Sequence, residues 1–236
     1  MPVALSIITS PQDGQNEQLS NMKGKALECA GLMASAVGKE KFMAHAQITL
    51  DTILKFVRQT HDSTLRRYAL SSAVRVASAL KNEFLPILPE LVPALCAGCK
   101  QDFGLQLIEA GQEEQSRALG YEVVHFHIRG EGTKIVQVNS SVVQEISTCV
   151  FVLYNFAHDL GESFAPYVPE VFAAISPLIQ ADSLEAVRNV AIVSLPHLIR
   201  CVLNHPQIAS QLFTESFFLL LEKLGQTEDD FDENEP

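Results

Sequence analysis

The chain has no tryptophan, few aromatic residues and no long apolar run. Of its 236 residues, 7% are aromatic, 12 are glycine and 11 are proline. This composition excludes collagen-like and low-complexity disordered chains. No apolar run approaches the roughly 20 residues that span a bilayer, and the N-terminus lacks the basic region and cleavage site of a signal peptide. We therefore expect no membrane insertion.

Cysteine is scarce and odd in number. The five cysteines mostly fall within apolar helical patterns, which indicates buried thiols in a reducing compartment rather than a disulfide framework. They are Cys29, Cys96, Cys99, Cys149 and Cys201. We therefore expect an intracellular protein.

Positive charge is also in short supply. The chain has 17 Lys and Arg against 28 Asp and Glu, and its net charge is -11. More than half of that net charge lies in an acidic C-terminal stretch, and we expect residues 226–236 to be a disordered tail. Because nucleic acids are bound by clustered Lys and Arg, the composition argues against nucleic acid as a direct partner and favours basic protein segments.

Hydrophobic residues are abundant, at 47% of the chain, and they follow a repeat. The segments 84–92 and 164–172 share the pattern Phe-x-Pro-x-x-Pro-Glu followed by apolar residues, displaced by 80 positions. That displacement corresponds to two repeats of about 40 residues, a period typical of helical solenoids.

A second pattern follows the proline segments, with an Asp at the turn and a basic residue three positions before an Ala. The Asp can cap the incoming helix, and the small Ala lets neighbouring helices approach closely. The matches are Asp182 with Arg188 and Ala191, Asp62 with Arg66 and Ala69, and, more loosely, Asp13 with Lys23 and Ala26. Together the two patterns indicate HEAT repeats.

The predicted fold is all-α, a right-handed HEAT-repeat superhelix in which consecutive helices form pairs. Apolar residues at three- and four-residue steps support the helices, as in the stripe from Val142 to Leu160. The expected helices are 3–9 with 15–37, 40–59 with 63–81, 84–100 with 140–160, 164–180 with 183–203, and a last helix over 206–224. HEAT repeats are thus expected over residues 1–101 and 140–225.

Residues 102–139 interrupt the third pair as an insertion. Between Tyr121 and Val138 apolar residues alternate on either side of Gly130-Glu131-Gly132, which predicts a β-hairpin. An isolated hairpin is marginal in water, so we expect it to pack on neighbouring helices or on a partner.

No pattern points to a catalytic, metal or cofactor site. Cys96 and Cys99 have the spacing of a thiol redox motif, but they end a helix in an all-α context, where core packing is the better interpretation. His125 and His127 share a strand face without the third or fourth ligand that a metal needs. We expect a binding protein that is not an enzyme and has no cofactor.

Several collinear stretches resemble β-karyopherins of the importin β-3 type. They are Lys23 to Cys29, Ala36 to Met43, Gly120 to Val124, Ser147 to Cys149 and Val187 to Ala191. The resemblance implies an internal segment of a nuclear import receptor, which binds cargo proteins with basic localisation signals and is regulated by the GTPase Ran. It also implies contact with nucleoporins and shuttling between cytoplasm and nucleus.

In the family that the chain resembles, the exposed strip of each second helix lines the inner wall that receives partners. The residues opposite the buried stripes, which we expect to bind cargo or another partner, are Glu28, Arg67, Ser71, Gln144, Phe151, Asn155, Asn189 and Arg200. The alternative function is a HEAT-repeat scaffold of the phosphatase or chromosome-organising type. A thiol oxidoreductase, a third alternative, depends on Cys96 and Cys99 alone.

Overall fold

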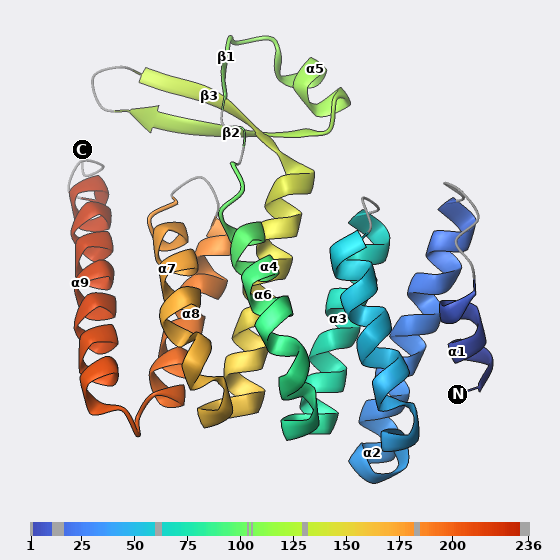
Figure 1. Ribbon diagram of the computed structural model, residues 1–236. Helices are drawn as coiled ribbons and strands as arrows, with labels where there is room; N and C mark the ends of the chain where they lie inside the picture. Colours follow the sequence, from blue (N-terminus) through green and yellow to red (C-terminus); the bar gives the residue numbers. More distant parts are fainter. Residues whose placement is uncertain are drawn as a thin grey trace.

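The helices stack in two layers, with a small sheet at one end (Figure 1). The computed structural model describes residues 2–10, 17–59, 63–102, 104, 106–128, 132–181 and 185–231. Its α-helices in the stack are α1 (Pro2–Thr9), α2 (Glu17–Gln59), α3 (Ser63–Leu80), α4 (Leu88–Cys99), α6 (Ser140–Leu160), α7 (Val168–Ile179), α8 (Glu185–Cys201) and α9 (Pro206–Phe231). Helices α2, α3, α6 and α8 pack in succession, and α4 and α7 lie against α6 and α8.

The long helix α2 is a pair of helices joined by a kink. We expected two helices, over 15–37 and 40–59, and α2 is continuous from Glu17 to Gln59 except at Gly38, whose backbone is non-helical (φ 76°, ψ 173°). Such a positive φ is accessible to glycine at little cost, whereas a side chain would be strained there. Gly38 therefore lets the chain pass from one layer to the other without a loop.

The two proline segments have the same conformation. Each begins with a 3₁₀ turn, η1 (Lys81–Ile87) and η2 (Gly161–Tyr167), before α4 and α7 start. We expected helices from 84 and 164, and the α-helices start four residues later. The 3₁₀ turns contain Pro86 and Pro166, which have no N–H to donate to an α-helical hydrogen bond. The next proline, Pro89 or Pro169, falls in the first turn of the α-helix, where its missing N–H leaves no bond unmade.

Phenylalanine rings join these two segments through α6. Phe156 lies between Phe84 and Phe164, with ring centroids 5.3 Å and 6.4 Å away, and all three are fully buried. Burying an aromatic side chain of this size contributes several kcal/mol, of the order of 2–3 per ring. One continuous core therefore links the third and fourth helix pairs.

The insertion contains the predicted hairpin and two elements that sequence analysis missed. Strands β2 (Tyr121–Ile128) and β3 (Gly132–Asn139) pair antiparallel, and β1 (Gln106–Ile108) adds to the other edge of β3. A short helix, α5 (Glu113–Ala118), precedes β2. Asn139 ends β3 and caps α6, because its Oδ1 accepts hydrogen bonds from the N–H groups of Ser141 (3.1 Å) and Val142 (3.4 Å). The sheet is thereby joined directly to the helix stack.

The last helix is longer than expected. We predicted a helix over 206–224 and a disordered tail over 226–236, and α9 continues to Phe231. Once a helix is nucleated, each added residue gains a backbone hydrogen bond, so acidic residues can continue it. Residues 232–236 lie outside the described part.

Hydropathy over the described helices gives no candidate for a bilayer span, because none is both long and apolar enough.

Candidate partner-binding face

One layer of the stack consists of the second helix of each pair. It comprises residues 17–37 of α2, together with α3, α6 and α8, and we call it the second-helix wall. In this layer α3 packs between α2 and α6, and α6 packs between α3 and α8. The first residues of α3, α6 and α8 lie at the end of the stack that carries the sheet (Figure 1). The exposed positions of these helices therefore form one surface.

All eight residues expected to bind a partner lie on this wall. Five are exposed and three are half-buried. The exposed ones are Arg67, Gln144, Phe151, Asn189 and Arg200, and the half-buried ones are Glu28, Ser71 and Asn155. Their position is as the helical periodicity indicated, and their role in binding remains a prediction.

Glu28 and Ser71 are brought together by an arginine that sequence analysis did not select. Arg75 lies 3.8 Å from the Glu28 carboxylate, and its Nη1 donates a hydrogen bond of 2.7 Å to the Ser71 hydroxyl. These contacts connect α2 to α3. Arg75 therefore offsets part of the Glu28 charge.

Arg67 and Gln144 both line a groove between α3 and α6. We call it the α3–α6 groove; its volume is about 270 Å³. It is lined by Thr64, Arg66, Arg67, Leu70, Ser141, Gln144, Glu145 and Thr148. Arg66 crosses the groove, with its Nη1 at 3.4 Å from Glu145 Oε1. Arg66 belongs to the predicted repeat pattern, whereas no pattern assigned a role to Glu145.

Phe151 belongs to a cluster of aromatic rings on α6 and α8. We define this aromatic cluster as Phe151, Tyr154, His158 and His197. Tyr154 lies 6.4 Å from Phe151, 6.2 Å from His158 and 5.0 Å from His197 between ring centroids. The two histidine rings are 5.1 Å apart. Aromatic rings that are partly exposed and held by neighbours are favourable contact points for protein partners.

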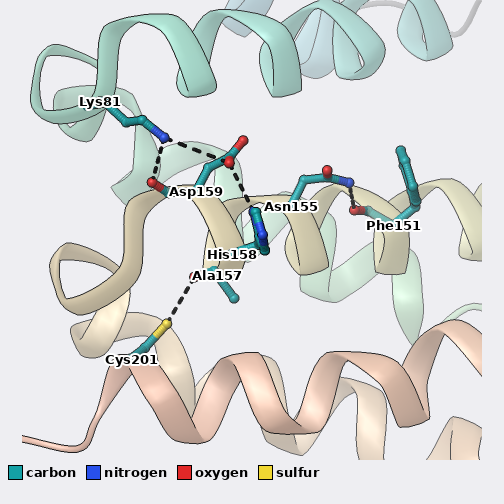
Figure 2. A network of polar contacts seen from close by, with 7 residues as sticks. All are labelled: Lys81, Phe151, Asn155, Ala157, His158, Asp159 and Cys201. Atoms are coloured by element: carbon teal, nitrogen blue, oxygen red, sulfur yellow. Dashed lines mark hydrogen bonds and ion pairs between the residues drawn. The ribbon is translucent and has the colours of Figure 1, made fainter.

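Polar contacts fix the exposed end of α6 beside this cluster (Figure 2). Asn155 Nδ2 donates to the carbonyl of Phe151 at 2.6 Å, and His158 Nδ1 lies 3.0 Å from Asp159 Oδ1. Lys81 Nζ donates to the carbonyl of Asp159 at 2.9 Å and lies 3.7 Å from its carboxylate. Lys81 thus fastens the end of α3 to the end of α6.

The histidine on α8 has a perturbed acidity. Burial lowers the pKa of His197 below the ordinary value, and the positive charges of His158 and Arg200 lower it further. The ring of His197 is therefore held in its neutral form more strongly than a solvated imidazole. Its ring packs edge-on against Tyr154, with centroids 5.0 Å apart.

Three of the buried cysteines, Cys96, Cys99 and Cys201, have raised pKa values. Burial raises the pKa of Cys96 to about 12, and a hydrogen bond with the Cys149 thiol, together with burial, raises the pKa of Cys99. The Cys201 thiol donates to the carbonyl of Ala157 at 3.2 Å (Figure 2), and burial raises its pKa to about 11. Because the thiolate is the reactive form, this geometry favours core packing over redox chemistry for Cys96 and Cys99.

The hairpin histidines add no further site. His125 is exposed, and the side chain of His127 lies outside the described part of the chain. Among the side chains that the structure describes, no three His, Cys, Asp or Glu are grouped as metal ligands.

Comparison with known proteins identifies relatives along most of the chain. No protein-family profile matches it. Importin subunit beta-3 of Saccharomyces cerevisiae is 31% identical over 209 residues, which is 86% of this chain and 18% of the relative. Probable importin subunit beta-4 of Schizosaccharomyces pombe is 27% identical over 181 residues, 74% of this chain and 17% of the relative.

Solved structures agree with the fold. The crystal structure of Kap121p bound to Ste12p matches with a TM-score of 0.78 and 28% identity, covering 94% of this chain and 20% of that one. Kap121p bound to RanGTP matches with a TM-score of 0.77 and 28% identity, covering 94% and 21%. The predicted HEAT-repeat solenoid is confirmed, and the chain spans about a fifth of the length of the relatives it matches.

Proposed function

Because this chain is homologous to karyopherins of the importin β-3 type, we propose that it is a segment of a nuclear import receptor. It binds cargo proteins that carry basic localisation signals, is regulated by the GTPase Ran, and meets nucleoporins while shuttling between cytoplasm and nucleus. The relatives are transport receptors rather than enzymes. The mechanism is non-covalent: partners bind to the solenoid, and Ran in its GTP form shifts the population of its conformations.

The observation that carries this proposal is the second-helix wall. Four helices in one layer expose polar and aromatic side chains toward the same side, and the aromatic cluster supplies rigid contact area with little entropy to lose on binding. Phe151 is 51% exposed, so its ring is available to a partner. The methylene stem and charge of a lysine can pack on such ring faces.

The test measures binding of a fluorescent Lys-rich localisation peptide to the 236-residue chain at physiological salt, with a scrambled peptide of equal charge as control. We expect the localisation peptide to bind more tightly, because pure charge attraction is screened. GTP-bound Ran should displace the peptide, whereas GDP-bound Ran should not.

Two variants locate the contact. Replacing Phe151 and Tyr154 by Ala should weaken peptide binding by about tenfold, as for residues of an interface hot spot. The matched control is Phe213→Ala, since Phe213 is 60% exposed on α9, outside the second-helix wall. Equal effects of the two changes would move the cargo site away from the aromatic cluster.

The scaffold alternative predicts a different result. A phosphatase or chromosome-organising subunit uses the same repeats but has no reason to respond to the nucleotide on Ran. Binding of a protein partner that is insensitive to Ran, with no preference for localisation peptides, would favour that alternative.

A further inference from the structure

The α3–α6 groove carries a surplus of positive charge. Two guanidinium groups, those of Arg66 and Arg67, face a single carboxylate, that of Glu145. Among the described residues, the ion pair that crosses the groove joins Arg66 to Glu145. It measures 3.4 Å, which is longer than the 2.7–2.9 Å of a strong charge-assisted hydrogen bond. Glu145 therefore neutralises the groove only in part.

Several hydrogen-bond donors in the groove are unused. Arg66 Nε is buried and has no hydrogen-bond partner among the described residues. Arg67 is exposed, and within the described part of the chain it forms no ion pair. The exposed guanidinium of Arg67, rather than the buried Nε of Arg66, is the donor that an incoming acceptor can reach.

The charge of the surrounding helix reinforces this surplus. Every charged residue of α3 is an arginine, namely Arg66, Arg67 and Arg75, although the whole chain has a net charge of -11. Thr64 and Ser141, which line the groove, lie in the first turns of α3 and α6. The positive end of each helix dipole is therefore near the groove. A cationic site in an acidic chain is a local feature that the composition does not explain.

We propose that the α3–α6 groove binds a carboxylate side chain from an acidic segment of a partner protein. The surplus is one positive charge, which a single carboxylate matches, and a guanidinium can hold both carboxylate oxygens. A phosphate carries nearly two negative charges, which exceeds the single positive charge left over in the groove. A long polyanion such as a nucleic acid would be repelled by the rest of the acidic chain.

This groove is distinct from the aromatic cluster, and the proposal goes beyond the function given above. The receptor function concerns basic signals, whereas the groove selects acidic ones. Each can fail without the other, since they use opposite charge and different side chains. A partner that carries both kinds of segment would contact two neighbouring sections of the second-helix wall.

The probe is a fluorescent peptide that contains four Glu residues spaced by Ser, and its affinity for the 236-residue chain is measured by anisotropy at physiological salt. The reference peptides replace Glu by Gln, or carry phosphoserine in place of Glu. We expect the Glu peptide to bind, the Gln peptide to bind at least about tenfold more weakly, and phosphoserine to give no gain. Tighter binding of the phosphoserine peptide, or no binding of the Glu peptide, would overturn the proposal.

Charge-matched variants separate the groove from the overall charge. Arg67→Gln should weaken binding of the Glu peptide by about five- to tenfold. Lys25→Gln, which removes one positive charge at an exposed position of α2 on the same wall outside the groove, should leave binding nearly unchanged. Equal losses in the two variants would mean non-specific attraction and would refute the site.

A gain of affinity gives the sharper test. Glu145→Gln removes the competing carboxylate and should strengthen binding by about threefold or more. Its control, Glu40→Gln, changes the net charge equally at an exposed position of α2 outside the groove. Thermal unfolding of each variant verifies that the chain is folded, and a loss of affinity in folded Glu145→Gln would contradict the proposal.

Discussion

Two sections of the second-helix wall differ in chemistry although their backbones are alike. The α3 section carries Arg66, Arg67 and Arg75, and the α6–α8 section carries the aromatic cluster. Both sections belong to one layer of helices that pack side by side. The difference therefore lies in exposed and half-buried side chains, so a repeat protein can vary its binding surface while its helices pack in the same way.

The largest expected effect comes from the core that both sections share. Phe156→Ala removes a fully buried ring between Phe84 and Phe164 and should lower the free energy of unfolding by about 3–5 kcal/mol. Phe151→Ala, on the same helix but 51% exposed, should cost less than about 1 kcal/mol. Urea unfolding of both variants measures the contrast, and equal losses would contradict the assignment of Phe151 to the surface.

A smaller effect should come from displacing α6 relative to α4. A Cβ added at Gly98 would lie 2.6 Å from Cys149 Sγ, so Gly98→Ala forces the two helices apart. Overpacking of this kind costs about 1–3 kcal/mol. The α3–α6 groove should change with it, because α6 forms one of its sides.

A second substitution, Cys149→Ala, removes the sulfur atom that the methyl group of Gly98→Ala would contact. A double-mutant cycle on the free energy of unfolding should show a favourable coupling between the two substitutions. If the two changes in the free energy of unfolding were strictly additive, the contact between residue 98 and Cys149 would not be the cause of the destabilisation by Gly98→Ala.

Lys81 connects the end of α3 to the end of α6 through Asp159. Its replacement should lower the free energy of unfolding by a still smaller amount. Lys81→Ala removes the hydrogen bond to the Asp159 carbonyl and should cost about 1 kcal/mol. The ion pair to the Asp159 carboxylate adds little, since the lysine side chain is 49% exposed.

The backbone at Lys81 supplies the control. Its φ is 53°, a conformation in which glycine avoids the steric penalty of a side chain. Lys81→Gly should therefore cost less than Lys81→Ala in urea unfolding. A larger cost for glycine would be inconsistent with the left-handed conformation.

Much of the fold could be predicted because it depends on local periodicity. The stripe of apolar residues within 140–160 predicted α6 with the bounds that the structure shows. The two proline segments predicted two equivalent repeats. The 3₁₀ turns were missed, since apolar spacing alone does not separate them from an α-helix. Strand β1 has only three residues, and its pairing with β3 depends on a contact distant in sequence.

Periodicity predicted which side of each helix the candidate residues face, whereas their contacts were not predicted, and their role in binding stays a prediction. Helical periodicity placed Glu28, Arg67 and Phe151 on one wall, because spacing within one helix determines which side a residue faces. The pairing of Glu28 with Arg75, and of Tyr154 with His197, depends on how neighbouring helices pack. A single helix contains no signal for such contacts, so a sequence alone does not reveal the groove or the cluster.

The smallest expected effect is a pH dependence of the free energy of unfolding, which should come from the aromatic cluster and not from the α3 section. The pKa of His197 is lowered in the folded chain, so around the ordinary value of about 6.5 the unfolded chain binds more protons than the folded one. Stability contributed by neutral His197 is therefore complete above that value and is lost as the pH falls below it. His197→Gln should flatten the fall in the free energy of unfolding between pH 7.5 and 5.5, measured by urea unfolding at each pH. His205→Gln changes an exposed histidine outside the wall and should leave the slope as it is; a flattened slope there as well would remove the link between the pH response and the aromatic cluster.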